Sequence, residues 1–398
     1  MNIYEELGKR KLIAQCINDD ETKNLINSGK AVFYIGFDPT ADSLHVGHLI
    51  SLIMTIHLQK NNNKAIILLG GGTGYIGDPS NKNSMRRIMR QEEIDNNCNK
   101  IKKQIQRIIG NKVIFVNNKK WILPLNIINF LRDVGPYFLI NDMLRAKCYQ
   151  QRLKTGLTFL EFNYLILQSY DFYVLSTKYG CNLQIGGDDQ WSNMIGGIDL
   201  IYKKTNKKNG VITTQLLTDK NGKKMGKTEN GAIWLDPKKT SPFDFYQYWR
   251  NIDDKITVKY LKMLTFIPLN EIKKYQKKEN INKLKMILAY ELTKLVHGQK
   301  IAKKIEKTAI NIFRKRDFSY APEKIIDVNS DITLKKILVL LNLCPNEKGG
   351  EFLIKQNCIF INNTLISDIN HVITFKELCA GILFKKGKKS FLKLKAKI

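Results

Sequence analysis

A pair of histidines in the N-terminal part of the chain could bind a triphosphate. His45 and His48 lie three residues apart at a predicted helix start, which a side-chain oxygen of Asp42 or Ser43 can cap. Backbone N–H groups and the helix dipole favour anions at such a position, and the hydroxyl of Thr40 would add a donor. Two histidines at this spacing can also be metal ligands or structural residues, but no third ligand lies nearby in the sequence.

A glycine-hinged cluster of lysines further along the chain could act on the same triphosphate. Lys224 and Lys227 flank Gly226 in a polar loop that follows a predicted strand. Ammonium groups on such a loop can stabilise a departing pyrophosphate as its charge develops, and Lys82 and Arg86 could do so from a second loop. Alone, the cluster could equally be a solvated run of charge, so its interpretation depends on the residues between the two segments.

A polar stripe on an otherwise apolar segment indicates which second ligand would bind beside the triphosphate. Tyr164, Gln168 and Asp171 fall at positions i, i+4 and i+7 of a helix predicted over 158–178, so they share one face. Because their neighbours are mostly apolar, a pocket wall is favoured over an ordinary solvent face. Asp171 and Tyr34, on the first predicted strand, could pair with a phenolic hydroxyl, and an analogue without the hydroxyl would leave them unpaired.

The elements that must position these residues alternate between strands and helices. Short apolar runs bounded by glycine or polar residues indicate buried parallel strands, and the segments between them have helical apolar spacing. The strands are predicted at 31–36, 65–69, 113–116, 182–186 and 211–217, and the helices at 48–57, 85–109, 158–178 and 190–203. This alternation predicts an α/β fold with a doubly wound, Rossmann-like parallel sheet.

A glycine-rich segment after the second predicted strand suggests a different site. Gly72, Gly74 and Gly77 form a G-x-G-x-x-G pattern, and Glu92 follows at the distance of a ribose-binding acid. Pro79 disfavours helix at the preceding residue, where the helix of a dinucleotide-binding fold should run. Glu92 also falls in a helical stretch instead of at the end of a second strand. We therefore do not expect a dinucleotide site.

Two breaks in the sequence divide the chain into three predicted domains. A proline-bounded stretch at 236–242 ends the α/β pattern, and a second break around Pro322 precedes a small C-terminal unit. We expect an α/β catalytic domain at 1–232, an α-helical domain at 233–325 and a small α+β domain at 332–398.

The C-terminal unit carries a pronounced excess of positive charge. Seven lysines and no acidic residue lie at 385–397, and the whole chain has a net charge of +29 and a pI near 9.7. We predict a helix over 334–343, a hairpin at Asn362-Asn363, and a tail whose lysines alternate with apolar residues on one strand face. The tail could be disordered and part of the charge merely solvated, but a nucleic-acid partner explains the pattern better.

The composition also indicates the cellular compartment. Seven scattered cysteines without a C-x-x-C pair predict reduced thiols instead of disulfides or a zinc site. The sequence shows neither an apolar leader nor a run of about 18 apolar residues. We therefore expect a cytoplasmic protein that does not span a membrane.

Taken together, these motifs resemble those of the class I aminoacyl-tRNA synthetases. Residues 40–48 contain the family's HIGH element with Val46 in place of isoleucine, and residues 224–228 match its KMSKS element, with Gly226 and Thr228 as variants. Each motif is weak alone, but their order and spacing on an α/β domain are specific. Four more segments narrow the resemblance, over the whole chain, to bacterial-type tyrosyl-tRNA synthetases: 34–40, 77–80, 164–171 and 184–191.

The resemblance implies a ligase that works in two steps. Tyrosine attacks the α-phosphate of ATP, bound as the Mg-ATP substrate, to give tyrosyl-adenylate and pyrophosphate, and tyrosine then passes to the 3′ end of tRNA(Tyr). It implies no protein-bound metal or organic cofactor, and it implies a homodimer, for which the apolar region 121–144 is a candidate surface. It also implies that the helical domain lies near the anticodon and that the last domain is of the RNA-binding alpha-L type.

The resemblance further assigns expected roles to individual residues. The residues implied to bind tyrosine are Tyr34, Asp78, Tyr164, Gln168, Asp171 and Gln190. Those implied to contact ATP are Asp38, His45, His48, Ser51, Gly187, Asp189 and Lys227. Those implied to stabilise the triphosphate in catalysis are Thr40, His45, His48, Lys82, Arg86, Lys224, Lys227 and Thr228. Those expected to bind tRNA are Lys385, Lys386, Lys388, Lys389 and Lys393.

Two positions depart from the family's familiar pattern, and two alternative functions stay open. Ile35 stands where a cysteine is common and removes a possible ribose contact, whereas Asp188 replaces a common serine and would add a carboxylate near the ribose.

A tryptophan-specific relative is disfavoured by the pair of Tyr34 and Asp171. A non-catalytic RNA-binding protein is disfavoured by the complete histidine and lysine motifs.

Overall fold

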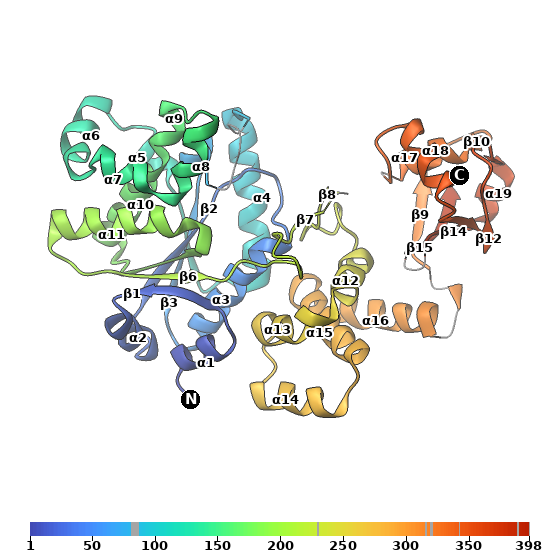
Figure 1. The fold of residues 1–398 in the computed structure, drawn as a ribbon, viewed down its shortest axis with the longest axis horizontal. Helices are drawn as coiled ribbons and strands as arrows, with labels where there is room; N and C mark the ends of the chain where they lie inside the picture. The colour runs from blue at the N-terminus through green and yellow to red at the C-terminus, as the bar shows by residue number, and fades with distance from the viewer. Residues whose placement is uncertain are drawn as a thin grey trace. The chain divides into compact units, whose positions relative to one another are not determined.

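The computed structural model describes most of the chain and divides it into two compact units. The described residues are 1–80, 87–228, 231–314, 317–318, 321–341, 343–387 and 390–397. The units are Met1–Gly298 and Gln299–Ile398 (Figure 1). Lys82, Arg86, Lys388 and Lys389 lie outside the described residues, and only the backbone of Lys227 and Thr228 is described. The expected domain boundary at 232/233 falls inside the first unit and stays a prediction.

A six-stranded sheet forms the centre of the first unit. Its strands are β1 (Ile13–Ile17), β2 (Val32–Phe37), β3 (Lys64–Leu69), β4 (Val113–Asn117), β5 (Leu183–Gly187) and β6 (Gly210–Thr214). Their order is β1-β6-β5-β2-β3-β4, in which β1 alone runs antiparallel to its neighbour. The five parallel strands are those that the sequence predicts. The edge strand β1 was not predicted, because its five residues contain no continuous apolar run.

Helices cover both faces of this sheet, as a doubly wound fold requires (Figure 1). The main ones are α3 (Leu49–Lys60), α4 (Gln91–Ile109), α10 (Tyr164–Tyr179) and α11 (Trp191–Thr205). The shorter ones are α1 (Ile3–Lys9), α2 (Asp19–Asn27), α5 (Lys119–Ile122), α6 (Ile127–Asp133), α7 (Ile140–Arg145), α8 (Lys147–Thr155) and α9 (Phe159–Phe162). Single 3-10 turns are η1 (Val46–His48), η2 (Thr73–Tyr75), η3 (Gly135–Tyr137) and η4 (Asp188–Gln190).

The helix predicted over 158–178 is two helices in the structure. Thr158 and Glu161 form a capping box at the N-terminal start of the short helix α9, and Asn163 separates α9 from α10. The carboxylate of Glu161 also pairs with the guanidinium of Arg152 at 2.8 Å in a nearly fully buried ion pair. The interruption falls at Asn163, whose side-chain amide donates to the carbonyl oxygen of Phe159 at 2.7 Å.

A helical segment completes the first unit. It contains α12 (Pro242–Arg250), α13 (Asp254–Leu264), α14 (Leu269–Lys278) and α15 (Ile281–His297), and the two-residue strands β7 (Lys227–Thr228) and β8 (Gly231–Ala232) precede it. Arg10, which is 2% exposed, connects this segment to the N-terminal end of the unit. Its guanidinium donates to the carbonyl oxygens of Lys262, Thr265 and Ile267 at 2.9–3.0 Å, so the segment is fixed to the sheet domain.

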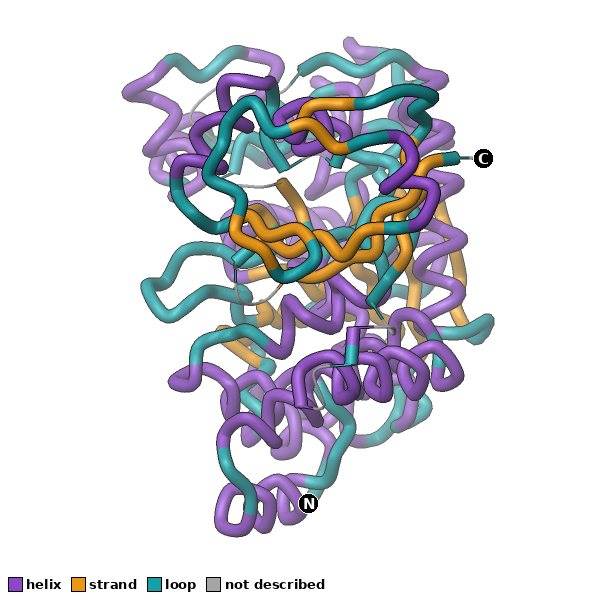
Figure 2. The backbone as a smooth tube through the Cα atoms, turned by 90° about the vertical axis from the view of Figure 1, so that its right-hand side faces the viewer, coloured by secondary structure: helices purple, strands orange, loops and turns teal. Residues whose placement is uncertain are grey.

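The second unit begins with α16 (Gln299–Arg314) and contains a five-stranded sheet of order β12-β11-β14-β15-β9. The strands are β9 (Glu323–Ile326), β11 (Ile359–Ile361), β12 (Thr364–Leu365), β14 (Ile382–Lys386) and β15 (Ser390–Ala396), beside a small pair of β10 (Ile332–Thr333) and β13 (Val372–Ile373). Three helices, α17 (Leu334–Leu340), α18 (Glu347–Lys355) and α19 (Phe375–Ala380), complete it. Figure 2 shows its strands side by side.

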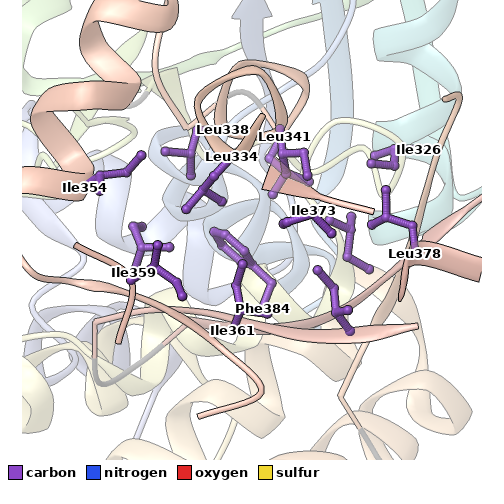
Figure 3. Packing of buried hydrophobic residues seen from close by; sticks show 14 of the residues in the cluster. Ile326, Leu334, Leu338, Leu341, Ile354, Ile359, Ile361, Ile373, Leu378 and Phe384 are labelled. Atoms are coloured by element: carbon purple, nitrogen blue, oxygen red, sulfur yellow. The ribbon is translucent and has the colours of Figure 1, made fainter. Parts of the chain in front are cut away.

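The interior of the second unit confirms the apolar pattern of its sequence. Leu334 and Leu338 of α17 pack against Ile361 of β11 and Phe384 of β14 in one buried cluster (Figure 3). The predicted hairpin is present, and Asn362 and Asn363 turn it with φ values of 48° and 68°. The tail forms strand β15, which pairs with β14 and β9. Across the described residues, no helix is long and apolar enough to cross a membrane.

Candidate active site

A cavity of about 610 Å³ lies in the first unit at the carboxyl ends of the parallel strands. The strand order changes direction between β2 and β5, and such a switch point leaves a crevice where ligands bind. Fourteen residues implied by the resemblance line this cavity together: Tyr34, Asp38, Thr40, His45, His48, Ser51, Asp78, Tyr164, Gln168, Asp171, Gly187, Asp189, Gln190 and Lys224. The structure therefore brings together segments that lie far apart in the sequence.

The two histidines are adjacent, but they are not held as predicted. Their ring centroids are 4.1 Å apart. His45 itself caps the turn η1, accepting a hydrogen bond at Nδ1 from the N–H of Gly47 at 3.1 Å, and α3 begins only at Leu49. Burial lowers the pKa of His48 to about 4, so its ring is neutral at pH 7 and offers a hydrogen bond instead of a charge.

The predicted caps have other partners. Asp42 pairs with Lys100 at 3.1 Å and with Lys239, and these ammonium groups hold the pKa of its carboxyl below the ordinary value. The hydroxyl of Ser43 donates to the carbonyl oxygen of Leu44 at 2.8 Å. The prediction that either residue caps the helix was therefore wrong, because the chain enters α3 through a 3-10 turn whose N-cap is His45.

The lysine loop packs directly against the histidine segment. The N–H of Val46 donates to the carbonyl oxygen of Ile233 at 2.9 Å, and the N–H of Ile233 donates to the carbonyl oxygen of Gly226 at 3.2 Å, so Ile233 joins the two segments. Gly226 has a φ of +111°, and a Cβ there would lie 2.8 Å from Nδ1 of His45, so a side chain would both strain the loop and push the ring away. Lys224 Nζ lies 2.8 Å from Asp189 Oδ2, at the rim of the cavity.

At one end of the cavity, two buried groups could receive a phenolic hydroxyl. Tyr34 and Asp171 are 1% and 2% exposed. Burial raises the pKa of Asp171 to about 8, and burial together with the charge of Asp171 raises the pKa of Tyr34. Among the residues that the structure describes, none hydrogen-bonds the Tyr34 hydroxyl. A buried hydroxyl without a partner is costly, so this end of the cavity is suited to a polar ligand atom.

Two residues that the sequence analysis missed hold the carboxyl of Asp171. Trp121 Nε1 donates to its Oδ1 at 2.7 Å, and Asn118 Nδ2 donates to its Oδ2 at 2.9 Å. Both follow the carboxyl end of β4, next to β3 in the sheet. That position, directly after a predicted strand, is the sequence signal that could have identified them.

The lining of the cavity also carries a network of carboxylates and amides. Tyr164 donates through its hydroxyl to Asp38 Oδ2 at 2.9 Å, and Gln190 Nε2 donates to Asp78 Oδ2 at 2.7 Å. Asn193 of α11, a residue that the sequence analysis also missed, donates to Gln168 Oε1 at 3.1 Å and to Gln190 Oε1 at 3.2 Å.

The two atypical positions lie in different environments. Ile35 lines the cavity and is 2% exposed. Asp188 does not line it: its Oδ1 accepts hydrogen bonds from Gln15 Nε2 at 2.6 Å and from Thr213 Oγ1 at 2.8 Å, beside strands β1 and β6. This geometry does not support the expectation that Asp188 adds a carboxylate near the ribose.

Comparisons with known proteins agree with this site. Residues 27–314 match the family described as tRNA synthetases class I (W and Y). The chain is 45% identical to a tyrosine–tRNA ligase of Clostridium beijerinckii over 100% of both chains, and 45% identical to one of Clostridium botulinum over 98% of both.

Solved structures show the same fold. A C-terminally truncated mitochondrial tyrosyl-tRNA synthetase of Aspergillus nidulans aligns with a TM-score of 0.69 and 27% identity, over 78% of this chain and 94% of that one. A tyrosyl-tRNA synthetase of Archaeoglobus fulgidus complexed with L-tyrosine shares the fold with a TM-score of 0.59, at 18% identity and over 77% of this chain and all of that one. The chain belongs to the class I aminoacyl-tRNA synthetases and, within them, to the bacterial-type tyrosyl-tRNA synthetases.

Asp171→Asn should remove a pH-dependent cost of burying this carboxyl. Its folded-state pKa of about 8 lies above the ordinary value of 3.8, so the native state binds the proton more tightly and loses stability as pH rises from about 4 to about 8. The free energy of unfolding of the variant, relative to wild type, should therefore rise by roughly a few kcal/mol over this range.

Urea unfolding followed by circular dichroism across this pH range measures the difference. Asp327→Asn, which alters a carboxylate that is 86% exposed, serves as the control. A difference between the Asp171 variant and wild type that does not change with pH would contradict the prediction.

Proposed function

We propose that this chain is a tyrosine–tRNA ligase that activates L-tyrosine with ATP and transfers it to tRNA(Tyr). The observation that carries the proposal is the buried pair of Tyr34 and Asp171 in the lining of a cavity that the histidine and lysine segments also line. The pair supplies partners for a phenolic hydroxyl, and the two segments supply donors for a triphosphate. The full-length similarity to tyrosine–tRNA ligases supports the same function.

In the proposed first step, the tyrosine carboxylate attacks the α-phosphorus of ATP in line. A carboxylate oxygen forms the new bond, the bond from the α-phosphorus to the bridging oxygen breaks, and the electron pair leaves with pyrophosphate. Tyrosine is held by its hydroxyl at Tyr34 and Asp171, and by its ammonium group at Asp78, Tyr164 and Gln168. Gln190 lies near its carboxylate. Positioning and charge stabilisation carry this step, so no covalent enzyme intermediate is needed.

The groups proposed to act on ATP come from four segments. ATP is bound as Mg-ATP, a substrate, and the proposal includes no resident metal or organic cofactor. Asp38, Ser51, Gly187 and Asp189 are assigned to the nucleoside end. The triphosphate is assigned to Thr40, His45, His48, Lys82, Arg86, Lys224, Lys227 and Thr228. Because Lys224 pairs with Asp189 across the rim, arrival of the nucleotide would exchange this carboxylate for phosphate oxygens.

Tyrosine-dependent exchange of labelled pyrophosphate into ATP tests the proposal. The purified chain should support exchange with tyrosine and far less with tryptophan or phenylalanine, since neither presents a phenolic hydroxyl to Tyr34 and Asp171. Exchange with tryptophan alone would identify a tryptophan-specific relative. Absence of exchange with any amino acid would favour an RNA-binding protein without this activity.

The C-terminal residues are proposed to bind tRNA. The protein is proposed to act in the cytoplasm. We assign the catalytic domain to 1–232, a helical anticodon-proximal domain to 233–325 and an alpha-L type domain to 332–398. The proposed contacts in the last are Lys385, Lys386, Lys388, Lys389 and Lys393. Lys385 Nζ lies 4.5 Å from the ring centroid of Phe360, and Lys393 Nζ lies 3.9 Å from Glu323 Oε1.

Removal of residues 334–398 should spare adenylate formation and reduce tRNA charging. The cavity lies entirely in the first unit, so the rate of pyrophosphate exchange should stay within about twofold of that of the full-length chain, while the loss of phosphate contacts weakens tRNA binding.

The full-length variant Lys385→Glu/Lys393→Glu should raise the KM for tRNA, and Lys112→Glu, which alters an exposed lysine of the first unit, is the control. Unchanged charging by both C-terminal variants would refute the assignment.

The protein is proposed to form a homodimer through its apolar surface at 121–144. Ile127 and Ile128 of α6 are each 67% exposed, and Leu139 and Ile140 are 64% and 63% exposed. A cluster of large apolar side chains in water is typical of a covered interface. In a symmetric pair, the same surface of each copy would meet the other.

Ile127→Asp/Ile128→Asp should convert the dimer to a monomer of 45.9 kDa in sedimentation velocity. Two buried carboxylates per copy would make the interface unfavourable. Phe352→Asp, which alters a residue 64% exposed in the second unit, should leave the dimer intact. A wild-type chain that sediments as a monomer at micromolar concentration would contradict the proposal.

A further inference from the structure

The glycine-rich segment that resembles a dinucleotide loop has a different arrangement. After β3 it continues into the single turn η2 (Thr73–Tyr75) instead of a long helix. Gly70 and Thr73 line the cavity. A Cβ at Gly70 would lie 2.0 Å from Asp38 Oδ1 and 2.6 Å from Thr73 Oγ1. The glycine is therefore required for the close approach of Asp38 and Thr73 to the backbone.

A continuous chain of hydrogen bonds runs through this segment. Asn118 Nδ2 donates to Asp171 Oδ2 at 2.9 Å and to Thr73 Oγ1 at 3.0 Å. The Thr73 hydroxyl then donates its own proton to Asp38 Oδ1 at 2.8 Å. The second oxygen of Asp38 accepts from the hydroxyl of Tyr164 at 2.9 Å. Asp171 at the tyrosine-hydroxyl end is thus connected to Asp38 at the nucleotide end.

The central members of this chain are buried and locked. Asn118 and Thr73 are 0% and 2% exposed. The N–H of Gly72 donates to Asn118 Oδ1 at 2.7 Å, which fixes the amide so that its NH₂ group faces Thr73 and Asp171. The Thr73 hydroxyl has one proton, which it donates to Asp38, and its oxygen accepts from Asn118, so this one group contacts both residues. In a buried network of this kind, each hydrogen bond polarises the next.

We propose that Thr73 is a positioning residue that couples the tyrosine-hydroxyl end of the cavity to Asp38. Occupation of the Tyr34–Asp171 end by a phenolic ligand redistributes the hydrogen bonds of Asp171 and Asn118, and Thr73 passes this change to the carboxylate assigned to ATP. A bound phenolic ligand then increases the affinity for the nucleotide. This inference rests on the proposed function, since it assigns the two ends of the cavity to tyrosine and ATP.

Calorimetric binding to the full-length protein tests the coupling. The probes are L-tyrosinol, which lacks the reacting carboxylate, and α,β-methylene-ATP, which cannot be cleaved at the reacting bond. In wild type, saturating tyrosinol should tighten binding of the nucleotide by about fivefold or more, a typical size of coupling between sites. By reciprocity, the nucleotide should tighten tyrosinol binding by the same factor.

Thr73→Val keeps the shape of the side chain and removes the hydroxyl. The ratio of nucleotide Kd values without and with tyrosinol should fall close to one, whereas Thr73→Ser should keep the wild-type ratio. Thr293→Val, which removes another fully buried hydroxyl from the first unit, should also keep it. Thr73→Ala provides a second variant without the hydroxyl if the valine variant does not fold. Loss of stability alone would not change this ratio.

Two results would overturn the inference: wild-type coupling in the valine or alanine variant, or no coupling in the wild type. Pyrophosphate exchange on the same wild-type preparation separates this failure from failure of the proposed function. Exchange that depends on tyrosine, together with an absence of coupling, would reject the role of Thr73 alone. Absence of exchange with tyrosine would reject the proposed function.

Discussion

The burial of one carboxyl group, that of Asp171, constrains much of the catalytic unit. A carboxyl group taken out of water is unfavourable unless donors surround it, and here Trp121 and Asn118 supply them. Both donors follow the carboxyl end of β4, and the N–H of Gly72 fixes the amide of Asn118. The glycine run after β3, the turn after β4 and the polar face of α10 are therefore parts of one arrangement around this group.

The sequence predicted the elements of this arrangement better than its contacts. The five parallel strands appear as apolar runs because both faces of the sheet are covered, and Tyr164, Gln168 and Asp171 reveal their shared face through helical spacing. Trp121 and Asn193 were missed because single side chains in loops and helix starts carry no periodic signal. The capping role given to Asp42 was wrong because ion pairs with Lys100 and Lys239, both distant in sequence, determine where its carboxylate lies.

The histidine and lysine segments are one structural feature, although they are far apart in the sequence. Backbone hydrogen bonds join the histidine segment to Ile233 and Leu235, which follow the lysine segment, and Ile233 also bonds Gly226. Glycines at 47 and 226 leave room for the ring of His45. The sequence shows both motifs but not their contact. A pairing between residues about 190 positions apart is determined by the tertiary fold and leaves no periodic signal in the sequence.

The clamp made by Arg10 has a consequence for the order in which the chain can fold during synthesis. Its three carbonyl acceptors lie 252 to 257 residues further along the chain. While the ribosome extends the polypeptide from its N-terminus, the first helix emerges long before those acceptors exist. Arg10 Nε can already pair with Glu6, but the two terminal nitrogens of the guanidinium have to be hydrated until then. The burial of the Arg10 side chain can therefore be completed only after residues 262–267 have been made, although Arg10 is among the first residues to be synthesised.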